Sequence, residues 1–276
     1  MCSITDQMTT LYTHVDDYLK ARPRLAAWRR SPHANPAFTD SEVLTIGLMQ
    51  GCLGVATLKQ TYRLIAHNFA DAFPKLPTYA QWLARLHALS PLVGLLMESF
   101  VLPLDSHLYL MDSKPIPLCK PIRHGRVRLM REDGAYFGKG TAGWFFGFKL
   151  HTITHQSGII LGAFLSPANW TDGDLAPALS HFVDGGVVLC DRAYQTQPLS
   201  DWLCEEAELL LLTPGNCGAA FRPLISSLRE RIETTFSQLC ERFVDRIRSR
   251  SFIGLWSAIK LKMLHFNLTQ AGYLPQ

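Results

Sequence analysis

The segment VVLCDRAYQ, residues 187–195, joins a short apolar run to a carboxylate. Four apolar or thiol residues lead directly into Asp191. Uninterrupted apolar runs of this kind are typical of strands that are covered on both faces, as in parallel sheets flanked by helices. The segment therefore predicts a buried strand that places Asp191 at its carboxyl end.

A second segment repeats this pattern, because LYLM at 108–111 runs directly into Asp112. If the two strands are parallel neighbours, their carboxyl ends meet at one edge of the sheet and the two carboxylates emerge side by side. The alternative is that each Asp caps a turn or a helix, since Asp readily accepts hydrogen bonds from nearby amides.

The rest of the second half of the chain reads as further strands and helices. Strands are predicted at 144–154, 159–165 and 209–213, with a hairpin turn between the first two. Helices are predicted near 197–208, 222–247 and 254–270. We therefore expect the α/β class, with a mixed sheet flanked by helices.

The first hundred residues read as helical, and Thr39 with Glu42 has the form of a capping box at a helix start. We expect two domains, a helical N-terminal region at 1–100 with a possible role in DNA binding and a second domain at 101–276. The short helices fit either a helix-turn-helix-like unit or a packed helical cap.

The predicted helix 222–247 supplies a third acidic candidate. Its apolar stripe follows the helical period, and at about 100° per residue Glu233 lies on the flank of the stripe, within reach of the sheet edge. Glu230 lies well outside the stripe, and Arg229 lies one turn before Glu233 and can pair with it. The alternative for Glu233 is an ordinary exposed position on an amphipathic helix.

Together, Asp112, Asp191 and Glu233 resemble a site for two divalent cations. Hard oxygen ligands select Mg²⁺ or Mn²⁺, and such a metal pair supports in-line phosphoryl transfer. Asp172, which follows the strand at 159–165, is a possible neighbour of this site, although a helix cap explains it equally well. His151 and His155 share one strand face, but they lack the context of a zinc motif.

Positive charge is concentrated in two segments of a chain whose formal net charge is +4. Segments 120–131 and 222–262 each contribute +5, so the remainder of the chain is left with −6. This pattern indicates a polyanionic partner, with solvated surface runs as the alternative. Candidate phosphate contacts in the first segment, within a loop expected at 115–143, are Lys120, Arg123, Arg126, Arg128 and Arg131.

The seven cysteines form no C-x-x-C motif, and several lie in apolar runs, which favours a reduced, intracellular protein. The N-terminus does not have the pattern of a signal peptide. The longest apolar stretch, at 91–104, is interrupted and too short to span a bilayer. We therefore expect a soluble protein without a membrane partner.

Four stretches carry a resemblance to a known family: YLMDSKPIPLC (109–119), GWFFGFKLH (143–151), VVLCDRAYQ (187–195) and RERIETTFSQL (229–239). They resemble the DDE transposases of bacterial insertion sequences, whose catalytic domain has a ribonuclease-H-like fold. The similarity extends to FTDSEVLTIGLMQ in the helical region. It implies a ribonuclease-H-like mixed sheet preceded by an all-helical region.

The resemblance also assigns roles to residues. It implies that Asp112, Asp191 and Glu233 are the catalytic metal ligands and that Arg229 is the basic residue four positions before the glutamate. Where larger relatives have a Tyr and a Lys or Arg around this motif, the chain has Ser226 and Cys240. Arg242 is a nearby candidate for the missing DNA contact.

The activity implied by the resemblance is metal-dependent cleavage and strand transfer at the ends of the protein's own DNA element, with two Mg²⁺ or Mn²⁺ ions per site. The implied partners are terminal inverted repeats, target DNA and a second copy of the chain, in the bacterial cytoplasm near the nucleoid. Two alternatives remain: a ribonuclease-H-like nuclease without strand transfer, and a catalytically decayed DNA-binding protein.

Overall fold

The computed structural model describes residues 3–26, 36–99, 106–123, 125–126, 129–140, 142–242, 244, 247 and 249–275. The chain forms two compact units, each described here by itself. The helical unit combines Met1–Met97 with Arg242–Gln276, and the sheet unit is Glu98–Glu241. The first boundary lies close to the predicted one. The C-terminal segment differs from the prediction, because it belongs to the helical unit.

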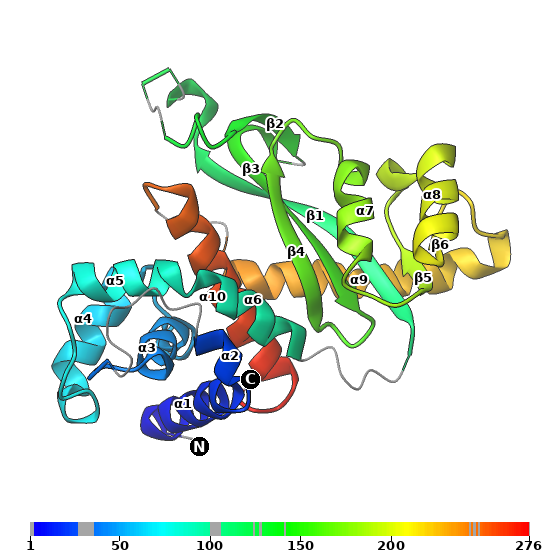
Figure 1. Ribbon diagram of the computed structural model, residues 1–276. Helices are drawn as coiled ribbons and strands as arrows, with labels where there is room; N and C mark the ends of the chain where they lie inside the picture. Colours follow the sequence, from blue (N-terminus) through cyan, green and yellow to red (C-terminus); the bar gives the residue numbers. More distant parts are fainter. Residues whose placement is uncertain are drawn as a thin grey trace. The chain divides into compact units, whose positions relative to one another are not determined.

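The helical unit consists of α1 (Ile4–Lys20), α2 (Pro23–Ala26), α3 (Asp40–Cys52), α4 (Leu58–Asn68), α5 (Tyr79–Ala88), α6 (Ser90–Glu98) and α10 (Phe252–Gln270) (Figure 1). Side-chain caps begin five of these helices, because Ser3, Thr39, Thr57, Thr78 and Ser251 each accept the N–H three residues further on. The capping box predicted at Thr39 and Glu42 is confirmed.

The C-terminal segment belongs to the helical unit because its helix α10 is buried there. This helix is apolar around most of its circumference and is buried from Leu255 almost to its end, where it packs on α3 and α5. Its two buried lysines are satisfied by backbone carbonyls, since Lys260 Nζ donates to Ser90 O and Lys262 Nζ to Arg242 O. A helix that is apolar all round must be surrounded, and this unit surrounds it.

The sheet unit contains β1 (Leu108–Cys119), β2 (Tyr136–Gly140), β3 (Gly143–His155), β4 (Ile160–Pro167), β5 (Gly186–Leu189) and β6 (Leu209–Leu212). Strand order is β2-β3-β1-β5-β6, with β4 also paired to β3. The pairs β1–β5 and β5–β6 are parallel, and β3 is antiparallel to its neighbours. The predicted mixed sheet is confirmed, with β1 at its centre.

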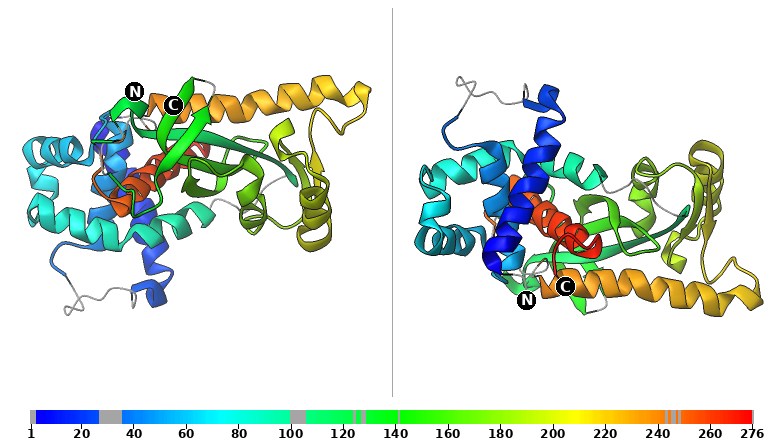
Figure 2. Two further views of the ribbon diagram at one scale, coloured as in Figure 1. Left: turned by 90° about the horizontal axis from the view of Figure 1, so that it is seen from above. Right: turned by 90° about the horizontal axis from the view of Figure 1, so that it is seen from below.

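Helices cover both faces of the parallel part of the sheet. On one face, α7 (Ala176–Ser180) and α8 (Gln197–Ala207) pack on Tyr109, Met111, Val188 and Cys190. On the other face, Leu108, Val187 and Leu189 line a cavity of about 390 Å³ together with Ile225 and Leu228 of α9 (Arg222–Glu241). Figure 2 shows α9 and α8 on opposite sides of the strands. The alternation of side chains along β1 and β5 produces this division.

Two expectations about local structure differ from what is observed. The segment expected as a loop at 115–143 is strand at both ends, since β1 continues to Cys119 and β2 begins at Tyr136. Both extensions depend on pairing with β3, which is distant in the sequence. The long helix α9 ends at Glu241 rather than at 247. Among the described residues, no helix has the length and apolar character needed to cross a membrane.

Candidate active site

The parallel ladder between β1 and β5 fixes the relative position of two acidic residues. Its last pair is Leu110 with Leu189, and Asp112 and Asp191 each follow two residues later. The same register therefore brings Asp112 opposite Asp191. Since side chains alternate along a strand, both carboxylates share the face of Leu108, which is the face covered by α9.

Each carboxylate is held by the backbone amide that follows it. Oδ1 of Asp112 accepts a hydrogen bond from the Ser113 N–H at 2.7 Å, and Oδ1 of Asp191 accepts one from the Arg192 N–H at 2.6 Å. Asp191 is also the N-cap of a short 3-10 turn, Arg192–Tyr194. The capping role considered for an isolated Asp is thus real for Asp191.

Arg229 connects α9 to this pair of acids. Its Nη1 lies 3.6 Å from Oδ1 of Asp191. Burial raises the pKa of Asp112 to about 6, against the hydrogen bond from Ser113 and the charge of Arg229, which lower it. The negative charges of Asp172 and Asp191 add to the increase. Burial of Asp112 is therefore the main cause of its raised pKa, and the neighbouring acids contribute less.

Glu233 does not join this pair. It lies on α9 one turn beyond Arg229, and its side chain is exposed. Within the part of the chain that the structure describes, no group of three His, Cys, Asp or Glu side chains is arranged to hold a metal ion. The structure therefore brings together Asp112, Asp191 and Arg229, and leaves the third predicted ligand outside.

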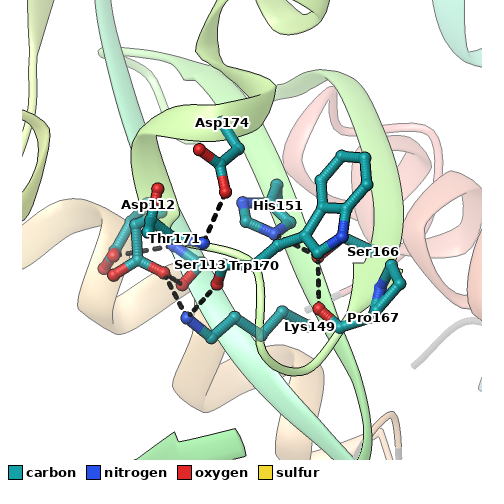
Figure 3. A network of polar contacts seen from close by, with 10 residues as sticks. Asp112, Ser113, Lys149, His151, Ser166, Pro167, Trp170, Thr171 and Asp174 are labelled. Carbon is teal, nitrogen blue, oxygen red and sulfur yellow. Dashed lines mark hydrogen bonds and ion pairs between the residues drawn. The ribbon is translucent and has the colours of Figure 1, made fainter. Parts of the chain in front are cut away.

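Asp172 belongs to a polar network next to Asp112, and Figure 3 labels its hydrogen-bond partners Ser113 and Lys149. Its Oδ1 accepts hydrogen bonds from Ser113 Oγ at 2.6 Å and from Lys149 Nζ at 2.9 Å. Lys149 Nζ also donates to the Trp170 carbonyl at 2.9 Å. Although burial raises the pKa of Asp172, the hydrogen bonds from Ser113 and Lys149 hold it below its ordinary value. Asp172 is thus an ionised acid that is hydrogen-bonded to Ser113, the residue that follows Asp112.

The two histidines of β3 are both hydrogen-bonded to serine hydroxyls. His151 is buried, its Nε2 lies 2.8 Å from Ser166 Oγ, and burial lowers its pKa to about 4. His155 is also buried and contacts the hydroxyls of Ser106 and Ser157. These contacts favour neutral, hydrogen-bonded imidazoles rather than zinc ligands.

The basic candidates differ in their surroundings. In the segment after β1, four of the five predicted residues are exposed, namely Lys120, Arg123, Arg126 and Arg131. Arg128 lies outside the described residues. Arg242 belongs to the helical unit, where its guanidinium carbon lies 5.4 Å from the centre of the Phe266 ring.

The sheet unit has a ribonuclease-H-like fold. Its central strand β1 has the parallel strands β5 and β6 on one side and the antiparallel strands β3 and β4 on the other, and the acid pair follows the parallel ladder. Residues 105–253 match the family model described as a transposase DDE domain. Since this match covers more than half of the chain, the protein belongs to that family and is a DDE-type transposase. No curated protein and no solved structure matches the chain significantly.

Proposed function

We propose that this transposase cleaves DNA at the ends of its own element and joins the freed 3′-OH to target DNA in a metal-dependent reaction. The observation that carries the proposal is the register of β1 and β5, which sets Asp112 opposite Asp191 on the face that Arg229 reaches. Paired carboxylates beside exposed basic residues suit a phosphodiester substrate.

The donor set of the pair fits divalent cations. Carboxylate oxygens are the ligands that Mg²⁺ and Mn²⁺ prefer, and the negative charges of Asp172 and Asp191 both act on Asp112. Asp112 and Asp191 would hold the ions. Glu233 of α9, whose exposed side chain stands apart from this pair, would have to turn towards it to serve as the third ligand. When bound, two such ions activate the attacking oxygen and stabilise the leaving oxygen.

The residues of the chain prepare this chemistry. Asp112 and Asp191 concentrate negative charge at a rigid strand end, and Arg229 offsets part of it. Asp172, which accepts a hydrogen bond from Lys149, also accepts one from the hydroxyl of Ser113 directly after Asp112. The exposed basic residues after β1 attract the DNA backbone.

The partners in this proposal are the terminal inverted repeats, the target DNA and a second copy of the chain, because two ends must be processed together. The element is proposed to be a bacterial insertion sequence, with the transposase acting at the nucleoid.

Cleavage of DNA that carries the element ends tests the assignment. Asp112→Asn should abolish strand cleavage in Mg²⁺ or Mn²⁺ while end binding, measured by fluorescence anisotropy, is largely retained. Cleavage by this variant would contradict the proposed role. Wild-type protein that cuts RNA in hybrids without joining strands would indicate a nuclease, and end binding without any cleavage would indicate a decayed enzyme.

Metal binding gives a readout that does not depend on activity. Calorimetric titration with Mn²⁺ should detect binding to the wild-type chain and its loss in Asp112→Asn and Asp191→Asn. Asp174→Asn is the matched control, because this acid accepts the Thr171 N–H at 2.6 Å and lies outside the pair.

A further inference from the structure

The helical unit contains a cavity of about 490 Å³ that has no part in the site described above. Its walls come from the end of α3, the starts of α4 and α10, one side of α5, and the residues Ile247, Ser249, Arg250 and Ser251. The apolar part of the wall includes Leu58, Leu83, Ile247 and Ala258. Residues from four separate helices therefore converge on one space.

Two helices begin at this cavity. Thr57 caps α4 and Ser251 caps α10, and each side chain accepts only the N–H three residues further on. The first-turn N–H groups of a helix have no acceptor within the helix and carry its positive partial charge. Two N-termini at one cavity make it favourable for an anion.

The charged side chains around the cavity have the same sign. Lys59 and Arg250 line it, and neither has a hydrogen-bond or ion-pair partner among the described residues. None of the described residues that line the cavity is acidic. Uncompensated basic groups beside two helix N-termini indicate a negatively charged ligand rather than an internal ion pair.

Two polar side chains that line the cavity each have a buried atom without a hydrogen-bond partner among the described residues. Gln50 is only 2% exposed, and its Oε1 has no hydrogen-bond partner among the described residues. Nε2 of His87 is buried and likewise unpartnered in that part of the chain. Orphaned polar atoms of this kind are uncommon in native proteins and point to a missing ligand or water. Rotation of the Gln50 amide presents its NH₂ group, so both residues can donate to an anion.

We propose that this cavity binds a phosphate group of a DNA strand, held by the first turns of α4 and α10 and by Lys59, Arg250 and Gln50. The apolar wall receives the adjoining deoxyribose, which explains a volume larger than a phosphate requires. That the phosphate belongs to DNA rests on the proposed function.

The test compares two double variants of the full-length chain in anisotropy titrations with end-bearing duplex DNA at several salt concentrations. Lys59→Ala/Arg250→Ala removes two charges from the cavity. Arg63→Ala/Lys75→Ala removes two exposed charges that do not line it. The cavity variant should lose about tenfold in affinity and about one unit of the slope of log K against log salt, as for one lost phosphate contact. The control should keep both values.

Equal losses in the two double variants, or no loss in the cavity variant, would overturn the proposal. Circular dichroism spectra and melting temperatures check that each variant is folded. Wild-type protein that binds DNA through the cavity but does not cleave it would contradict the proposed catalytic function and leave this site standing.

A second measurement separates DNA from free phosphate as the source of the anion. Inorganic phosphate should raise the melting temperature of the wild-type chain, and Gln50→Leu should reduce that increase without lowering the melting temperature in phosphate-free buffer. If inorganic phosphate stabilises the protein while Lys59→Ala/Arg250→Ala leaves DNA affinity unchanged, the site serves free phosphate and the proposal for DNA is wrong.

Discussion

Asp112 and Asp191 stand opposite each other because each lies two residues beyond Leu110 and Leu189, the last pair of the parallel ladder between β1 and β5. Their proximity is therefore set by backbone hydrogen bonding and not by attraction between the side chains. Two like charges held in this way depend on Arg229 and on any bound cation for compensation.

Removing Arg229 should make Asp112 harder to ionise. The charge of Arg229 lowers the pKa of Asp112, which burial sets at about 6, so Arg229→Gln should raise this pKa above 6. A carboxyl-carbon NMR titration of labelled aspartate measures the change. Arg231→Gln is the matched control, because this guanidinium donates to the Gln156 carbonyl. An unchanged pKa in Arg229→Gln would remove Arg229 from the electrostatics of the site.

Asp172→Asn should destabilise the sheet unit. Lys149 is 13% exposed as a side chain, and the change leaves its ammonium group without the carboxylate 2.9 Å away. We expect a loss of about 2 kcal/mol in the free energy of unfolding, as for a partly buried charge that loses its partner. Urea denaturation measures this loss. The double variant Lys149→Met/Asp172→Leu should lose less free energy of unfolding than Lys149→Met and Asp172→Leu lose in sum. Additive losses would show that the two side chains are not coupled.

Acidification should destabilise the protein between pH 6.5 and about 4. Burial lowers the pKa values of His151 and His265 to about 4, so in this window the unfolded chain binds more protons than the folded one. Their contribution is complete above pH 6.5 and falls by up to about 1.4 kcal/mol per pH unit for each histidine. Asp112 acts in the opposite direction, because its pKa is raised, and offsets part of the loss below pH 6.

Urea midpoints at pH 7.5, 6.5, 5.5 and 4.5 check this dependence. His265→Leu should make it shallower, whereas His67→Leu, at an exposed position, should leave it as in the wild type. A midpoint that does not change with pH would contradict the burial of neutral histidines.

Gly186→Ala should disrupt the start of β5. Gly186 has φ of +122°, and an added Cβ would lie 2.3 Å from the His107 carbonyl oxygen, which accepts the Val187 N–H. Backbone strain and the clash together should lower the free energy of unfolding by about 3 kcal/mol. Gly94→Ala in α6, where a Cβ meets nothing within 4 Å, should be neutral or stabilising. Urea denaturation of both variants decides the comparison.

The sequence predicts the parts of the fold that depend on local apolar pattern. The runs before Asp112 and Asp191 indicate covered strands, and the structure places both strands in the sheet as parallel neighbours. The start of β2 and the extension of β1 to Cys119 are not predictable in this way, because they exist through pairing with β3. Pairing with a strand that is distant in the chain does not alter the local apolar periodicity of the sequence.

The site was predictable to a similar extent. Helical angle predicts that Glu233 of α9 lies within reach of the sheet edge. In the structure the Glu233 side chain is exposed, and Arg229, one turn earlier, contacts Asp191. Asp172 follows its strand like an ordinary cap, and its connection to Ser113 becomes visible only when β3 and β4 bring Lys149 beside it. The membership of α10 was missed because a helix that is apolar on every side indicates burial without indicating a partner.

The register of β1 also determines which kinds of genetic change the enzyme tolerates. Side chains along this strand alternate between the α9 face and the apolar cluster that contains Met111. Deletion of one residue between Leu108 and Asp112 would leave the strand apolar. It would, however, point the Asp112 carboxylate towards the opposite face, where the apolar cluster lies. Conservative substitutions in this strand should therefore spare the acid pair, whereas a single-codon insertion or deletion should displace Asp112 and, under the proposed function, abolish cleavage.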